Sequence, residues 1–157
     1  VKLILKFWMT DDEKWMNFAI KQAIQAEKVG EVPIGAVLVR DGLLIAKAHN
    51  QPITKNDATA HAEIQLLRKA GKKLENYRLN GSTLFVTLEP CAMCFGAMVH
   101  ARVKRIVFGA HDPKTGACGS SEDLTNSNCF THKINITGGV SERKCSQLLQ
   151  TFFKSRR

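Results

Sequence analysis

The first part of the chain places apolar residues three or four positions apart, which is the spacing of one helical face. Thr10 and Asp11 can cap the start of this helix, and Gly30 ends it after Val29. The apolar face consists of Trp15, Phe18, Ala19, Ala23 and Ala26. The pattern predicts a helix over residues 11–29 with this face in the core.

The pattern then changes to short, nearly continuous apolar runs. Residues 33–40 are apolar and β-branched, which predicts a buried strand, and residues 43–48 predict its partner. The Asp41-Gly42 pair between them is a two-residue hairpin signal. Residues 50–57 are polar and rich in turn formers, so we expect a loop there.

Helical spacing returns after this loop. We expect a helix over residues 60–70, because apolar and polar positions again alternate with helical period. Asp57 or Thr59 can cap its start, and Gly71 is expected to close it.

A strand–helix–strand unit follows the turn signal at Asn80-Gly81. Residues 83–88 predict a strand, residues 90–101 a helix and residues 105–108 a further strand. Because the links are short, this unit predicts parallel strands joined by a right-handed crossover.

The remaining chain is irregular until its last elements. Residues 109–133 show little periodicity and predict a long loop of the kind that is often functional. Residues 134–136 predict a fifth strand, and residues 141–155 a closing helix. Its inward positions are Leu148, Leu149, Phe152 and Phe153. Together the elements predict an α/β fold with three α/β/α layers around a mixed five-stranded sheet.

Length and composition indicate one globular unit. With 157 residues, of which 44% are hydrophobic, the chain can bury a full core, and we assign one domain to residues 1–157. Residues 1–8 are apolar with two lysines and are too short for a signal peptide. Since Met9 precedes a good helix start, we expect residues 1–8 to be an extension outside the core. No run approaches the length of a transmembrane helix.

Charge and cysteine content bear on partner and compartment. Lys and Arg number 23 against 14 Asp and Glu, which gives a net charge of +9. This favours a polyanionic partner, with nucleic acid first, although a charge excess that only aids solubility remains an alternative. Five cysteines are an odd number. They fit a reducing cytoplasm better than a disulfide framework.

Two short motifs carry the candidate chemistry: Ala-His-Ala-Glu at residues 60–63 and Pro-Cys-x-x-Cys at residues 90–94. Imidazole nitrogen and thiolate sulfur are ligands that Zn²⁺ prefers, so His61, Cys91 and Cys94 are candidate ligands. Pro90 suits the first position of the predicted helix, whose N-terminus favours thiolates. Three protein ligands leave one position for water, as in catalytic zinc sites.

The presence of Glu63 favours a catalytic zinc site over a structural one. Two positions after His61, its carboxylate can face a water that zinc activates, take its proton and pass it to a leaving group. A purely structural zinc site does not need this residue. Cys118, Cys129 and Cys145 lack the spacing of a closed knuckle, and a redox pair or two buried thiols at Cys-x-x-Cys remain alternatives.

The combination of His-x-Glu with Pro-Cys-x-x-Cys resembles the zinc nucleobase deaminases. Three runs, at residues 31–37, 60–64 and 87–119, look like those of bacterial tRNA-specific adenosine deaminases, and the similarity extends from Glu13 to Arg157. This resemblance implies zinc, one ion per subunit, and conversion of adenosine to inosine at the wobble position of an arginine tRNA. It also implies a cytoplasmic homodimer in which both subunits shape the tRNA site.

The resemblance also implies substrate contacts. Asn50 would contact the target nucleotide, Ile34 would wall the base, and Asp112 would contact the RNA backbone or a ribose. The amide N–H groups of Ala62 and Cys91 would face the attacking oxygen. Further candidates for the anticodon groove are Lys114, Thr115, Phe153 and Arg156. From the residues alone, Asn50 and Asp112 are equally typical turn formers.

Two other functions use the same residues. A deaminase of free guanine or cytosine, or of a nucleotide, would need the same zinc core but no extended basic surface. A zinc-stabilised RNA-binding module would need the basic surface but neither Glu63 nor an open zinc position. RNA binding should weaken steeply as salt rises, whereas turnover of a small molecule should not.

Overall fold

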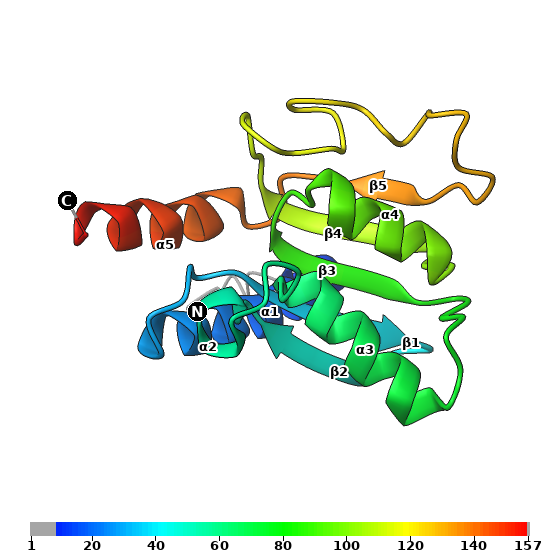
Figure 1. Ribbon diagram of the computed structural model, residues 1–157, viewed down its shortest axis with the longest axis horizontal. Helices are drawn as coiled ribbons and strands as arrows, with labels where there is room; N and C mark the ends of the chain where they lie inside the picture. The colour runs from blue at the N-terminus through cyan, green and yellow to red at the C-terminus, as the bar shows by residue number, and fades with distance from the viewer. Residues whose placement is uncertain (1–8, 157) are drawn as a thin grey trace, which may run out of the picture.

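The computed structural model describes residues 9–156, whose strands form one mixed five-stranded sheet with helices on both faces (Figure 1). The expected extension at residues 1–8 lies outside the described residues. The strands are β1 (Gly35–Arg40), β2 (Leu43–His49), β3 (Thr83–Leu88), β4 (Arg105–Ala110) and β5 (Asn135–Thr137). The helices are α1 (Asp11–Lys28), α2 (Pro52–Lys55), α3 (Ala62–Leu74), α4 (Ala92–His100) and α5 (Glu142–Lys154).

The strand order is β2-β1-β3-β4-β5. β1 pairs antiparallel with both β2 and β3, whereas β3, β4 and β5 run parallel. The predicted parallel pairing across the strand–helix–strand unit is therefore confirmed. So is the hairpin at Asp41-Gly42, where both residues have the positive φ, 52° and 71°, that a two-residue turn of this kind requires.

The two faces of the sheet are covered by different helices, so neighbouring residues of one strand enter different clusters. Leu38 and Val86 pack with side chains of α3 and α4, whereas Val37, Phe85 and Val107 pack with α1 and Cys145 of α5. Because both faces are buried, the strands read as continuous apolar runs in the sequence. This arrangement confirms the predicted three-layer α/β/α class.

The first helix is capped as predicted and packs tightly on the sheet. Thr10 Oγ1 accepts from the Glu13 amide at 3.2 Å, and the Glu13 carboxylate accepts from the Thr10 amide at 2.8 Å. At Gly35, an added Cβ would lie 2.1 Å from the Ala19 carbonyl oxygen. Only glycine allows α1 to approach β1 this closely.

The start and the end of α3 differ from the predictions. The helix begins at Ala62 with His61 as its N-cap, so neither Asp57 nor Thr59 caps it. Asp57 instead accepts from the amide and hydroxyl of Thr59 at 2.8 Å, in a local turn. The helix continues through Gly71 to Leu74, because one glycine costs a helix only about 1 kcal/mol and does not stop it.

Two further boundaries were predicted wrongly. The loop expected at residues 50–57 contains α2, a single turn that begins with a proline at a position where no N–H is needed. α4 begins at Ala92, so Cys91 is its N-cap and Pro90 lies before the helix. The long irregular segment is confirmed: between β4 and β5 the backbone forms only turns and isolated bridges. Within the described residues, no helix combines the length and apolar character needed to cross a membrane.

Candidate active site

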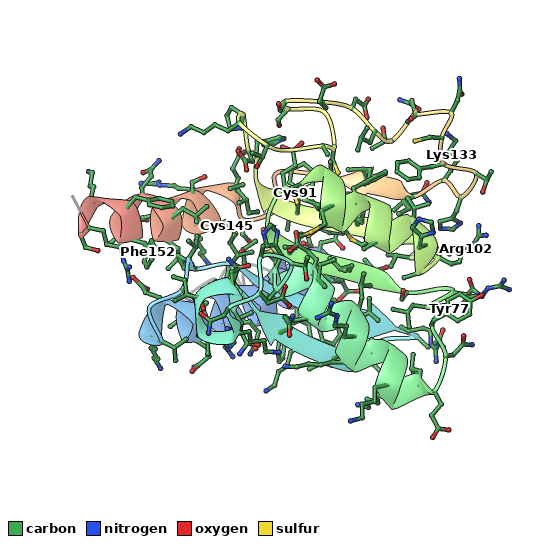
Figure 2. All side chains as sticks on the ribbon, viewed as in Figure 1. Tyr77, Cys91, Arg102, Lys133, Cys145 and Phe152 are labelled. Carbon is green, nitrogen blue, oxygen red and sulfur yellow. The ribbon has the colours of Figure 1, made fainter. Side chains whose placement is uncertain are left out.

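His61, Cys91 and Cys94 come together where the N-termini of α3 and α4 meet. His61 Nδ1 lies 3.7 Å from Cys91 Sγ and 3.5 Å from Cys94 Sγ. The three ligand atoms all lie within 4.8 Å of one another. Figure 2 shows Cys91 at the start of α4. His61 and Cys91 are the N-caps of α3 and α4, and because these two helix N-termini meet, residues 30 positions apart share one site.

The donor set fits zinc. Zn²⁺ binds cysteine sulfur at about 2.3 Å and histidine nitrogen at about 2.0 Å, so a tetrahedral ion separates its ligand atoms by about 3.5 Å. The two separations in the structure, 3.5 and 3.7 Å, match this value. Among the described residues, this is the one group of three His, Cys, Asp or Glu side chains with metal-binding geometry. The predicted ligands therefore lie together and fit the metal.

The electrostatic environment of Cys91 and Cys94 is suited to binding a cation. Hydrogen bonds from the Cys94 thiol and from His61 lower the pKa of Cys91 to about 4. The same contact with the Cys91 sulfur raises the pKa of Cys94, whose thiol is the donor of the pair. The hydrogen bond to Cys91 also raises the pKa of His61. A dication in place of these protons would stabilise both thiolates.

Glu63 is buried in the first turn of α3, with 4% of its surface exposed. Burial, followed by the charge of Cys91, raises the pKa of its carboxyl group to about 7. A carboxyl group with such a pKa can both accept and donate a proton near neutrality, which general acid–base catalysis requires. Glu63 interacts with Cys91, His61 and Cys94, so it lies beside the ligand cluster, as the sequence predicts.

Asn50 and Ile34 lie side by side at the open end of the β1–β2 hairpin. The Asn50 amide N–H donates to the Ile34 carbonyl at 3.0 Å. The Asn50 side chain is buried, and its Oδ1 accepts from the Ala62 amide at 3.1 Å. The Ala62 N–H, predicted to face the attacking oxygen, is thus engaged by Asn50. This bond instead fixes Asn50 against the helix that carries Glu63.

Asp112, Lys114 and Thr115 form one turn in the long irregular segment. The Asp112 carboxylate accepts from the amides of Lys114 and Thr115 at 3.0 and 3.2 Å, and from the Thr115 hydroxyl at 2.7 Å. Burial alone would raise the pKa of Asp112, but these hydrogen bonds outweigh it and lower the pKa. The turn lies next to the metal ligands, because Gly116 forms a β-bridge with Cys91.

The C-terminal candidates are not part of this cluster. Phe152 is buried and Phe153 is 50% exposed, so one of the two predicted inward phenylalanines faces solvent. The Arg156 guanidinium lies 4.2 Å from the centre of the Phe152 ring and donates to the Gly30 carbonyl at 3.2 Å. Figure 2 shows Phe152 on α5, well away from Cys91.

Sequence reasoning missed Glu89. It is buried directly before Pro90 and accepts hydrogen bonds from the loop that carries Asp112. A charged residue between an apolar strand and Pro-Cys-x-x-Cys was a visible signal, although the sequence alone does not identify its partners.

Comparisons with known proteins identify the family of this chain. The family model of MafB19-like deaminases matches residues 10–157. A tRNA-specific adenosine deaminase of Haemophilus influenzae is 51% identical over 147 residues, covering 93% of this chain and 85% of that protein. One of Bacillus subtilis is 49% identical over 149 residues, covering 95% and 92%.

Solved structures show the same fold. A structure from work on A-to-I editing by tRNA:A34 deaminases at the wobble position of transfer RNA has a TM-score of 0.85 and 42% identity, covering 87% of this chain and 99% of that chain. A guanine deaminase of Nitrosomonas europaea has a TM-score of 0.80 at 24% identity, covering 92% and 85%, and shares the fold. By the family model and by these relatives, the chain belongs to the MafB19-like deaminases and, among them, to the tRNA-specific adenosine deaminase family.

Proposed function

We propose that this chain hydrolytically deaminates adenosine to inosine at the wobble position of a tRNA anticodon. The observation that carries the proposal is the buried Glu63 beside the His61, Cys91 and Cys94 cluster, in a chain 51% identical to a tRNA-specific adenosine deaminase. A zinc-stabilised RNA-binding module without catalysis would have no use for a buried carboxyl group there.

The chain's own residues account for the proton movements of the reaction. Zinc held by His61, Cys91 and Cys94, one ion per subunit, would supply an activated water, because bound Zn²⁺ lowers the pKa of water to about 7. Glu63 takes a proton from the water as its oxygen adds to C6, and delivers it to N1 of the purine. When the bond between C6 and the exocyclic nitrogen breaks, the second proton of the water passes through Glu63 to that nitrogen, which leaves as ammonia.

Other residues would hold the substrate in place. Asn50, fixed by its bond to Ala62, would contact the target nucleotide, and Ile34 would wall the base. The Cys91 amide N–H remains our candidate for stabilising the attacking oxygen. Asp112, Lys114 and Thr115 would contact neighbouring nucleotides.

The RNA partner follows from charge and from the relatives. A net charge of +9 favours a phosphate backbone, and an anticodon loop is single-stranded, so extruding its base costs less than from a duplex. We include in the proposal an arginine tRNA as substrate, a homodimer as the active form and a cytoplasmic location, since relatives at 49–51% identity are bacterial tRNA-specific adenosine deaminases.

Inosine formation tests the proposal directly. Zinc-loaded protein with an arginine tRNA anticodon stem-loop should convert the wobble adenosine to inosine, detected by nucleoside mass spectrometry. Affinity for the stem-loop should fall by about tenfold or more between 50 and 200 mM salt if several phosphates are contacted. Free guanine, cytosine and their nucleotides serve as the comparison. Conversion of these substrates, with no inosine in the stem-loop, would favour the free-base or nucleotide deaminase.

Substitutions of Phe152 and Phe153, which are adjacent on α5, distinguish a contribution to the core from a contribution to RNA binding. Phe152→Ala should lower the free energy of unfolding by about 3 kcal/mol, because a large buried side chain is removed. Phe153→Ala should leave stability nearly unchanged and raise the Kd for the stem-loop about fivefold, as expected for a lost base-stacking contact. Thermal unfolding and RNA binding measure the two effects. An unchanged Kd for Phe153→Ala would remove this residue from the RNA surface.

A further inference from the structure

The Glu89 carboxylate is buried, with 2% of the residue exposed, and every bond it makes goes to one loop. Its Oε1 accepts from the amides of Cys118 and Ser120 at 3.0 and 3.1 Å. Its Oε2 accepts from the Asp112 amide at 3.0 Å and from the Ser120 hydroxyl. No ion pair involves Glu89 in the part of the chain that the structure describes.

A buried carboxylate without a cation depends on its hydrogen bonds. Both Glu89 oxygens are acceptors for two donors each, an arrangement that suits an ionised carboxylate. Because all the donors belong to residues 112–120, any other path of this loop would leave a buried charge unsatisfied. The conformation of the loop and the burial of Glu89 therefore depend on each other.

The loop backbone packs directly on the carboxylate. An added Cβ at Gly116 would lie 2.5 Å from Glu89 Cδ and 2.6 Å from the Asp112 carbonyl oxygen. The glycine lets the loop close over Glu89 with no side chain between them.

The same loop connects the metal ligands to the candidate RNA contacts. On one side, Gly116 forms a β-bridge with Cys91, and the Ala117 amide donates to the Pro90 carbonyl at 2.9 Å. On the other side, the Asp112 amide held by Glu89 begins the turn in which the Asp112 carboxylate binds Lys114 and Thr115. Glu89 lies directly before residues 90–94, the metal-binding turn that carries Cys91 and Cys94, and contacts the loop on both sides of its bridge to Cys91.

We propose that Glu89 is a positioning residue, which holds residues 112–120 in their RNA-binding conformation against the metal-binding turn. This inference rests on the proposed function, because the loop's contact with RNA is part of that function. A preformed loop avoids the ordering cost that a mobile one would add to RNA binding. Among the described residues, the Glu89 carboxylate forms no hydrogen bond or ion pair with His61, Cys91 or Cys94. Its loss should therefore raise KM for RNA more than it lowers kcat.

Glutamine is the informative substitution because it has the shape of glutamate. In Glu89→Gln, one acceptor oxygen becomes an amide donor. That donor would then face either Cys118 and Ser120 amides or the Asp112 amide and Ser120 hydroxyl. A donor facing donors leaves buried N–H groups unpaired. Ser120→Ala is the milder variant, since it removes one hydroxyl and leaves three amide bonds.

The test combines three measurements on zinc-loaded protein. Amide hydrogen exchange follows Asp112, Cys118 and Ser120; metal analysis gives the zinc content; and kinetics on an anticodon stem-loop give KM and kcat. For Glu89→Gln we expect faster exchange at these amides, unchanged zinc content and a KM raised by about tenfold or more, with kcat within about threefold. Ser120→Ala should raise KM by about threefold, because only one of the four hydrogen bonds to the carboxylate is lost.

Glu122→Gln is the matched control, because it makes the same change in the same loop. The Glu122 side chain is exposed and accepts no hydrogen bond from any residue described, so exchange and KM should not change. Unchanged exchange and KM in Glu89→Gln would overturn the proposal, as would a lower melting temperature with an unchanged KM. If Glu89→Gln does not fold, unchanged exchange and KM in Ser120→Ala would overturn it. If wild-type protein makes no inosine, the proposed function fails, while the exchange data still test the hold of Glu89 on the loop.

Discussion

Glu63→Ala is expected to reduce inosine formation by about 10⁴-fold while the protein keeps its zinc. A loss of about 10⁴-fold is the upper end of the range for general acid–base catalysis. The variant removes the buried carboxyl group beside the ligand cluster and leaves His61, Cys91 and Cys94 in place. With no group to move protons between water, purine and leaving amine, chemistry should fail and metal binding should not. Single-turnover rates on the anticodon stem-loop and metal analysis of the same sample measure both quantities.

Two further variants make this result specific. Glu63→Gln keeps the shape and should be inactive to a similar degree, since an amide cannot accept the proton. Glu75→Gln changes an exposed glutamate at the other end of α3 and should retain full activity. If Glu63→Ala retained turnover within about tenfold of wild type, the general acid–base role would be wrong, since that role accounts for about 10²-fold or more.

His61→Ala is expected to lose bound zinc, and with it activity and part of the stability. Two cysteine ligands remain, but Zn²⁺ sites of this type need three protein ligands, and the lost imidazole also stabilised the Cys91 thiolate. A metal that binds only the folded state stabilises it by RT ln(1 + [Zn]/Kd), so the loss of binding should appear as a lower melting temperature. Metal analysis after dialysis and thermal unfolding with and without added zinc give the two readouts.

His100→Ala is the matched control for this prediction. His100 is an exposed histidine in the last turn of α4, the helix that carries Cys94 at its start. It should keep full zinc content and respond to added zinc as wild type does. An unchanged zinc content in His61→Ala would contradict the ligand assignment.

Much of the fold follows from local patterns. The hairpin at Asp41-Gly42, the capped start of α1 and the continuous apolar strands were predicted because each depends on residues close in the chain. The errors lie at element boundaries, where several local signals compete. Gly71 locally favours a helix end, yet the packing of Leu66, Ala70 and Leu74 in the core carries α3 through it to Leu74.

In the candidate site, too, some features follow from the residues themselves and others only from the fold. The chemistry of the site can be inferred from residue types alone, because the side chains of His61, Glu63, Cys91 and Cys94 have bonding preferences that imply a metal and a proton carrier. How these groups are held is visible only in the folded chain. The Ala62 amide donates to Asn50, which lies 12 positions earlier in the chain. Glu89 anchors the loop of Asp112 through hydrogen bonds to residues 23 to 31 positions later. Such hydrogen bonds depend on the three-dimensional path of the backbone, which spacing along the chain does not specify.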